Sequence, residues 1–143
     1  MNPEFEKCLR RGKLREFSRG KYLVEKEFNI GLKDLEDAKD SFKRKKFKWA
    51  TIQAYYAMFH FARALIYAEN YREKSHYCLM VALRALYVEK GRLDLSLVES
   101  FQRAKTLREN ADYYDEWSET GAEELLKSAE KFSVKVGEIL RIG

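Results

Sequence analysis

Proline, glycine and cysteine are scarce in this 143-residue chain, and each scarcity excludes a class of fold or site. The single proline, Pro3, and the seven glycines supply too few turn residues for the many short strands of an all-β domain. The two cysteines, Cys8 and Cys78, form neither a Cys-x-x-Cys pair nor a cluster with histidine. We therefore expect neither a zinc site nor a disulfide framework, and a reducing, cytoplasmic location fits this cysteine usage.

The chain also lacks a long hydrophobic run. Its most apolar segment, residues 54–68, is interrupted by His60 and Arg63, so we expect no membrane span, and the N-terminus has no signal-peptide pattern. Hydrophobic residues make up 45% and charged residues 36%, a balance too apolar for a disordered chain. The length fits one hydrophobic core. We expect a single domain over residues 1–143.

Hydrophobic periodicity predicts an all-α fold, an up-and-down antiparallel bundle of four to five main helices with a short N-terminal helix. The expected helices cover residues 4–11, 21–45, 49–70, 75–91, 95–117 and a last segment from residue 120 onward. Ser75 can cap the start of its helix and Gly91 can end it in a left-handed conformation. Thr120 and Glu123 have capping-box spacing. Gly31 is expected to be a weak point in the first long helix.

The helix expected at residues 49–70 is apolar on nearly every side, so bundle neighbours or a second copy of the chain must cover it. Gln53, His60, Arg63 and Tyr67 nevertheless form a polar line along it. Burying such groups without partners would be costly. Two interpretations remain open: hydrogen bonds to neighbouring helices or a twin subunit, or a cleft that faces a ligand.

Three further polar residues lie where their side chains need a partner. Arg108 continues the spacing of Phe101 and Ala104, so its side chain leaves from the packed side of its helix. Asp112 follows one turn later, but arginine before aspartate is the less favourable order within a helix, which points to a contact across an interface. His76 lies in the first turn of its helix, where the dipole keeps the imidazole neutral. A neutral histidine can act as a base or can simply pack.

Basic residues are concentrated in two segments, and the net charge is +5. The segments contain Arg10, Arg11, Lys13, Arg15, Arg19 and Lys21, and then Lys43, Arg44, Lys45, Lys46 and Lys48. Such clusters can bind phosphate backbones. Because acidic residues are almost as numerous, a solvated charged surface is the simpler interpretation.

Several stretches, in this order and spacing, resemble the HEPN family, specifically its small prokaryotic branch with an Arg-x-x-Ala-Asp-Tyr motif. They are residues 54–60 (Ala-Tyr-Tyr-Ala-Met-Phe-His), 63–65 (Arg-Ala-Leu), 74–76 (Lys-Ser-His), and Arg108 with residues 111–113 (Ala-Asp-Tyr). The resemblance spans nearly the whole chain. It implies a HEPN-like bundle that forms a homodimer about a two-fold axis. It also implies association with a minimal nucleotidyltransferase partner in a toxin–antitoxin pair.

The resemblance has a specific consequence for activity. Many relatives are metal-independent ribonucleases, in which an arginine followed four to six residues later by a histidine faces its copy across the dimer. Arg108 matches that arginine, but Asp112, Tyr113 and Tyr114 occupy the histidine positions. In some relatives the partner transfers AMP onto a tyrosine just beyond the arginine, and Tyr113 or Tyr114 resembles that acceptor.

These observations lead to three hypotheses, none of which calls for a metal or a cofactor. The first is a dimeric module that binds a nucleotide or RNA, or a nucleotidyltransferase partner; its site would comprise Arg108, Asp112, Tyr113, Tyr114, Gln53, Arg63 and Tyr67. The second is a metal-independent ribonuclease toxin that uses Arg108 with His60 or His76. The third is an orphan dimer in which the motif residues only hold the subunits together.

Overall fold

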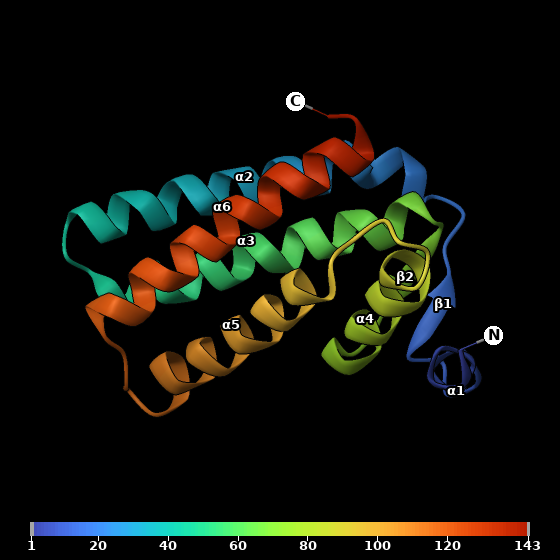
Figure 1. Ribbon diagram of the computed structural model, residues 1–143, viewed down its shortest axis with the longest axis horizontal. Helices are drawn as coiled ribbons and strands as arrows, with labels where there is room; N and C mark the ends of the chain where they lie inside the picture. The colour runs from blue at the N-terminus through green and yellow to red at the C-terminus, as the bar shows by residue number, and fades with distance from the viewer. Residues whose placement is uncertain (1, 143) are drawn as a thin grey trace.

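The computed structural model describes residues 2–142 and is helical apart from two short strands (Figure 1). In chain order the elements are α1 (Pro3–Arg10), β1 (Leu14–Glu16), α2 (Gly20–Lys43), α3 (Phe47–Ala68), β2 (Tyr71–Glu73), α4 (His76–Leu83), the π-helical segment η1 (Arg84–Val88), α5 (Leu95–Tyr113) and α6 (Glu119–Leu140). The prediction of an all-α helical bundle is confirmed.

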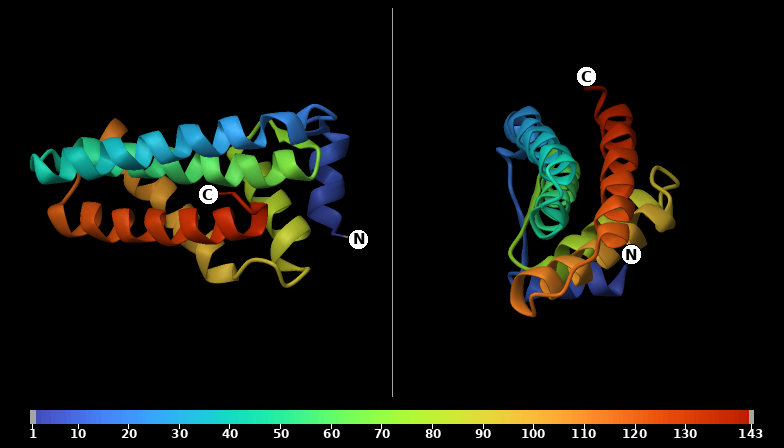
Figure 2. Two further views of the ribbon diagram at one scale, coloured as in Figure 1. Left: turned by 90° about the horizontal axis from the view of Figure 1, so that it is seen from above. Right: turned by 90° about the vertical axis from the view of Figure 1, so that its left-hand side faces the viewer.

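The four long helices form an up-and-down bundle. In Figure 1, α2 runs antiparallel to α3, and α5 runs back along the other side of the bundle before α6 returns. The end-on view in Figure 2 shows α2 and α3 together, with α6 beside them and α5 crossing beneath α3 and α6. The short α1, the strands and α4 close one end of the bundle. The chain therefore passes through α4 on its way from α3 to α5.

Helix α3 is the centre of the packing, and it contacts α2, α4, α5, α6 and β2. Its apolar side chains are covered on several faces, as the sequence requires. The approach of α2 is very close at Gly31, where an added Cβ would lie 2.6 Å from Cε1 of Phe61 and 3.1 Å from the Ala57 carbonyl oxygen. Gly31 thus allows the two helices to touch, and the cost of glycine within a helix is offset by packing.

Several predicted helix ends were wrong by a few residues, and the turns explain why. Lys45 and Asn70 both take the left-handed conformation, with φ of 62°, so α2 and α3 end earlier than predicted. Helix α5 stops at Tyr113 instead of residue 117, and Asp115 follows with φ of 56°. Helix α6 is capped by Ser118, whose Oγ accepts from the Gly121 N–H (2.9 Å), and not by Thr120.

The predicted Ser75 cap and the left-handed Gly91 are confirmed, but the helical segment ends at Val88, with Glu89 as its C-cap, and not at Gly91. Ser75 Oγ accepts from the N–H of Cys78 (3.1 Å), and Gly91 is left-handed with φ of 70°. Between them the helix changes to a π-helical turn at η1. The antiparallel strands β1 and β2 were not predicted, because three-residue strands are too short to show a periodicity of two.

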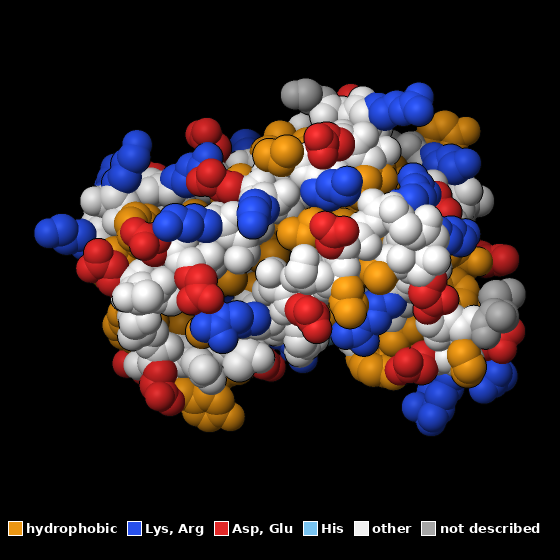
Figure 3. Space-filling view, in the orientation of Figure 1, with side chains coloured by type: hydrophobic (Ala, Val, Ile, Leu, Met, Phe, Trp, Pro, Cys, Tyr) orange, Lys and Arg blue, Asp and Glu red, His pale blue; other side chains and the backbone are white. Residues whose placement is uncertain are grey.

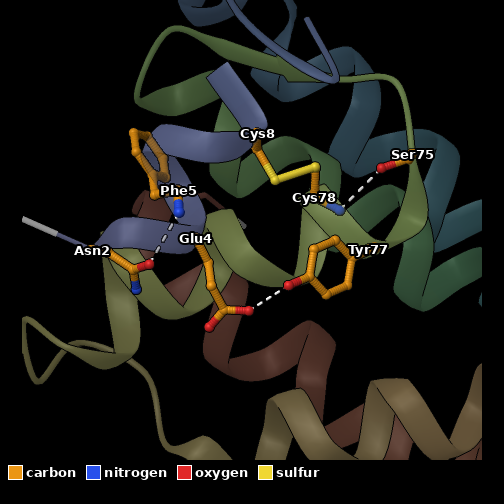
Figure 4. The surroundings of a disulfide bond; sticks show 7 residues. All are labelled: Asn2, Glu4, Phe5, Cys8, Ser75, Tyr77 and Cys78. Carbon is orange, nitrogen blue, oxygen red and sulfur yellow. Dashed lines mark hydrogen bonds between the residues drawn. A yellow bond between two sulfur atoms is a disulfide. The ribbon is translucent and has the colours of Figure 1, made fainter. Parts of the chain in front are cut away.

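The expectation that the cysteines are unpaired was wrong. Cys8 of α1 and Cys78 of α4 form a disulfide, with their Cα atoms 5.8 Å apart and both side chains buried (Figure 4). They are separated by 70 residues, so only the packing of α1 on α4 brings them together. Tyr77 donates a hydrogen bond to Glu4 beside the bond. Disulfides of this kind are rare in reducing compartments, although intracellular proteins of hyperthermophiles are an exception.

Lysine, arginine and acidic side chains are interspersed over the face shown in Figure 3. This face fits the solvated charged surface expected from the composition. Across residues 2–142, none of the helices combines the length and apolar character needed to cross a membrane.

Reduction of the Cys8–Cys78 bond should destabilise the protein. A bridge that closes a loop of 70 residues is expected to contribute about 4 kcal/mol by restricting the unfolded chain. Guanidinium chloride unfolding with and without a thiol reductant measures the difference. The double variant Cys8→Ala, Cys78→Ala is the control and should show no response to the reductant. Coincident unfolding curves for the oxidised and reduced wild type would contradict the expectation.

Candidate functional site

Arg108 lies near the end of α5 and is held among tyrosine rings. Its side chain is 12% exposed, which agrees with its predicted departure from the packed side of the helix. The guanidinium carbon lies 4.9 Å from the ring centre of Tyr55, 5.5 Å from that of Tyr56 and 5.4 Å from that of Tyr113. Cations over aromatic faces are stabilised by the ring quadrupole. The rings therefore hold the guanidinium group of Arg108 in one position.

The polar partners of Arg108 come from the same helix, α5, and satisfy only some of its hydrogen-bond donors. Nη1 donates to the Tyr113 hydroxyl (3.1 Å) and lies 3.5 Å from Oδ2 of Asp112. Nε is buried and has no hydrogen-bond partner among residues 2–142. A buried donor without a partner costs roughly 1–3 kcal/mol, so this guanidinium can still gain from an acceptor.

His76 packs on the same tyrosine as Arg108. Its ring stacks on Tyr55 at 6.0 Å between centres and is tilted against Phe101 at 5.0 Å. Burial, together with the nearby positive charges of Lys105 and Arg108, lowers the pKa of His76 to about 4. The imidazole is therefore neutral at pH 7. The sequence attributed this to the helix dipole, whereas the structure adds burial and two neighbouring cations.

Unpartnered buried atoms gather at this cluster, which we call the Tyr55 cluster: Tyr55, His76, Arg108 and Tyr113. Three buried side-chain nitrogen or oxygen atoms lack a partner within the described chain, and two of them are His76 Nε2 and Arg108 Nε. Burial also raises the pKa of Tyr55 to about 12, so its hydroxyl stays protonated. Buried polar groups are normally paired, so these two nitrogens retain hydrogen-bonding capacity that the described chain does not use.

Exposed aromatic side chains lie on α3 and at or just after the end of α5, and two of them, Tyr56 and Tyr113, contact Arg108. They are Trp49 (51% exposed), Tyr56 (37%), Tyr113 (65%), Tyr114 (68%) and Trp117 (46%). Lys48 links two of them, lying 5.4 Å from the ring centre of Trp49 and 5.5 Å from that of Trp117. Tryptophan, tyrosine and arginine are the residues enriched at the centres of protein interfaces. We call these five side chains the aromatic rim.

The remaining predicted site residues lie on another side of α3, against α2 and β2. His60 Nδ1 donates to a carboxylate oxygen of Glu27 (2.5 Å), and Nε2 lies 3.6 Å from Asp34. The Gln53 amide lies 2.7 Å from the Ser41 hydroxyl. The structure therefore pairs the first part of the polar line with α2 and does not bring His60 to Arg108.

The other half of the polar line is also paired within the chain. Arg63 donates from Nε (3.2 Å) and Nη2 (3.0 Å) to the two carboxylate oxygens of Glu73 on β2, which is only 6% exposed. Tyr67 packs against the Phe17 ring at 5.3 Å. For Gln53, His60 and Arg63, the geometry shows hydrogen bonding to neighbouring elements of the same chain.

Sequence reasoning missed several residues of the site. Tyr55 and Tyr56 belong to residues 54–60, which carry the family resemblance. By periodicity alone they are only part of the apolar surface of their helix. Lys105 carried no signal beyond its position one turn before Arg108. Trp117 was placed inside a helix that ends earlier. Within residues 2–142, the structure contains no cluster of three or more histidine, cysteine or acidic side chains that could hold a metal ion.

Comparison with known proteins adds to this geometry. The model of the HEPN domain family matches residues 24–139, a range that holds the whole Tyr55 cluster. The chain is 30% identical over 113 residues to "Putative toxin MJ0605" of Methanocaldococcus jannaschii, which covers 78% of this chain and 84% of that protein. It is 34% identical over 103 residues to a UPF0332 protein of Archaeoglobus fulgidus, covering 71% and 82%. A second Methanocaldococcus jannaschii protein, "Putative toxin MJ0142", is 27% identical over 90 residues, covering 63% and 61%.

The low pKa of His76 can be measured by NMR. The imidazole protons of His76 should titrate near pH 4, and Arg108→Met should raise the midpoint because it removes a nearby positive charge. The unfolded chain binds a proton on this histidine near pH 6.5 but the folded chain does not, so the stability of the fold should fall as the pH drops from 6.5 toward 4.

His76→Phe isolates that contribution, since acidic groups elsewhere also titrate in this range. The wild type should lose more stability than this variant between pH 6.5 and 4 in urea unfolding. A midpoint near the ordinary value of 6.5 for His76, with parallel stability profiles for the two proteins, would show that the imidazole is not shielded.

Proposed function

Because the chain belongs to the HEPN domain family, we propose that it is a toxin-like, dimeric module whose Tyr55 cluster binds the phosphate of an RNA or a nucleotide. Two relatives carry the word toxin in their names, which supports the toxin-like role. We further propose a minimal nucleotidyltransferase as its partner in a toxin–antitoxin pair. The family resemblance of the Arg108, Asp112 and Tyr113 segment supports that partner.

The observation that carries this proposal is the pair of buried, unpartnered nitrogens at Arg108 and His76. Arg108 supplies a fixed positive charge, and guanidinium binds phosphate oxygens with well-defined geometry. His76 is neutral and adds no repulsion or attraction of its own at pH 7. A phosphate oxygen that reached Arg108 Nε would replace a lost hydrogen bond by a charge-assisted one, and such bonds contribute roughly 1.5–3 kcal/mol.

The aromatic rim supports the second copy of the chain as the occupant of this face. A two-fold interface is self-complementary, so the rim of one subunit would pack against the same rim of the other. Such pairing would exclude water from the two Arg108 side chains and strengthen their interaction with an anion. Two guanidinium groups repel each other, and either Asp112 or a bound phosphate between them would compensate.

Tyr113 and Tyr114 are the proposed acceptors for AMP from the partner. Both side chains are well exposed, and the Tyr113 hydroxyl already contacts Arg108, which could hold an incoming phosphate. In this step the tyrosine oxygen attacks the α-phosphorus of ATP on the partner, the bond to the β-phosphate breaks, and pyrophosphate and the hydroxyl proton leave. Mass spectrometry after incubation with partner and ATP would locate the added adenylyl group.

Arg108→Ala should weaken the binding of RNA at least tenfold, a loss of about 1.4 kcal/mol or more. Fluorescence anisotropy with a labelled RNA measures the affinity. Arg103→Ala is the matched control, because Arg103 lies on the same helix but is exposed and paired with Glu124 (3.2 Å). This control should bind within twofold of the wild type.

Sedimentation of the same proteins tests the dimer. The wild type should sediment as a dimer, and replacing the rim residues Tyr56 and Trp117 by serine should yield monomers. If Arg108→Ala binds RNA like the wild type while Asp112→Ala alone dissociates the subunits, the motif holds the dimer together and binds no phosphate.

A metal-independent ribonuclease is the second candidate function, and the shared contact of His76 and Arg108 with Tyr55 favours it. The neutral His76 would take the proton from a ribose 2′-hydroxyl as that oxygen attacks the phosphorus, and the 5′-oxygen would leave with a proton from water. Arg108 would stabilise the phosphate charge. The motif histidine is missing, since Asp112, Tyr113 and Tyr114 occupy its positions, and this places the ribonuclease function second.

Incubation of RNA with purified protein in EDTA separates the two functions. Under the ribonuclease hypothesis the wild type cleaves and leaves cyclic phosphate ends, and both Arg108→Ala and His76→Ala abolish cleavage. His60→Ala should retain it, because His60 is paired with Glu27 away from the cluster. Intact RNA with every protein, together with measurable binding, supports the module without ribonuclease activity.

A further inference from the structure

A second basic site lies beside the two-stranded sheet. A cleft of about 500 Å³ is lined by side chains of β1, β2 and α3, and by Phe17 and Lys74, which follow the two strands. Its cations are Arg15, Arg63, Arg72 and Lys74, against Glu16 and Glu73. It is separate from the Tyr55 cluster, and none of the motif residues of α5 lines it. Arg15 belongs to the first basic segment, which the proposed function has not used.

The sheet register forces two of these cations together. Arg15 is directly opposite Arg72, while Leu14 is opposite Glu73. Leu14 is 1% exposed and Glu73 is 6% exposed, so burial of these two fixes the register and leaves both arginines on the outer face. Like charges directly opposite each other destabilise a sheet. Neither arginine has an acidic ion-pair partner within 4 Å among residues 2–142.

The carboxylates of the cleft do not neutralise its charge. Glu73 is engaged by both Nε and Nη2 of Arg63, so it compensates that residue and not the others. Glu16 is the other carboxylate residue in the lining of the cleft, against three further cations. Arg72 lies over the Phe17 ring, with its guanidinium carbon 5.5 Å from the ring centre. The ring supports the guanidinium and leaves its N–H groups available to an anion.

We propose that this cleft binds the backbone phosphates of a single-stranded nucleic acid. Its volume lies within the range of small-ligand sites, which suits one or two nucleotides and not a duplex. Positive charges beside an aromatic ring are the usual means of holding single strands without reading their sequence. The local repulsion between Arg15 and Arg72 is then offset by the bound anion, since such conflicts are expected at functional sites.

The inference rests on the proposed function only in taking RNA as the ligand. Strand β2 leads through Lys74 and Ser75 directly to His76, so the cleft and the Tyr55 cluster are consecutive along the chain. A strand of RNA held at the cleft would thus be tethered beside the cluster. The cleft would contribute affinity, and the cluster would contact one particular phosphate.

Anisotropy with a labelled 20-nucleotide RNA tests the cleft in the full-length protein. The double variant Arg15→Ala, Arg72→Ala should bind at least tenfold more weakly than the wild type. Its plot of log affinity against log salt should be shallower by about 1.4, that is about 0.7 for each lost phosphate contact. Lys127→Ala with Lys131→Ala is the matched control, since these exposed lysines of α6 line another part of the surface, and it should bind within twofold of the wild type.

Arg72→Glu separates binding from folding. The substitution places a carboxylate opposite Arg15, so the melting temperature at low salt should stay unchanged or rise, while RNA binding should fall at least tenfold. A purely structural role for Arg72 predicts unchanged binding instead.

Arg108→Ala measured in the same assay distinguishes the two sites. If the cleft variants bind like the lysine control while Arg108→Ala loses affinity, the cleft proposal is overturned and the proposed function stands. If only the cleft variants lose affinity, the cleft stands and the role of Arg108 falls. Failure of the wild type to bind the RNA also overturns the proposal.

Discussion

The structure depends on the covering of α3, a helix that is apolar on nearly every side. Helix α2 covers one face, and α5 and α6 cover another, with α4 and β2 at the end. Burial of apolar surface contributes roughly 25 cal/mol for each Å² removed from water, so every element that covers α3 is held strongly in place. The covering of α3 also decides which polar residues are in contact, because each face of α3 packs against a different neighbouring element.

Two faces of α3 therefore have different chemistry. The face toward α2 and β2 carries His60 and Arg63, each paired with a carboxylate of the covering element. Such pairs satisfy buried groups and fix the position of the neighbours. The face toward α4 and α5 carries Tyr55, which receives His76 and Arg108 without satisfying their nitrogens. Only the second face keeps hydrogen-bonding capacity for a partner outside the chain.

The end of the molecule that bears the sheet adds a further constraint. The disulfide joins α1 to α4, and the β1–β2 pair joins the segments that precede α2 and α4. These links fix the start of α4, where His76 lies, against the rest of the bundle. They also fix the two facing arginines of the sheet, Arg15 and Arg72, at a site that local stability alone would disfavour. Rigid support of this kind favours binding, because little order is lost when a ligand arrives.

The sequence by itself determined the helical bundle, the central place of α3, the Ser75 cap and the burial of Arg108. Each of these depends on a period of 3.6 residues or on a local hydrogen bond, and both involve residues that are close together in the sequence. The prediction was weaker for the site. It placed Arg108 beside either His60 or His76, and only tertiary packing put His76 on Tyr55 and paired His60 with Glu27. Tertiary structure also decided the Cys8–Cys78 bond. Contacts across 70 residues depend on how whole helices pack, and no local spacing encodes them.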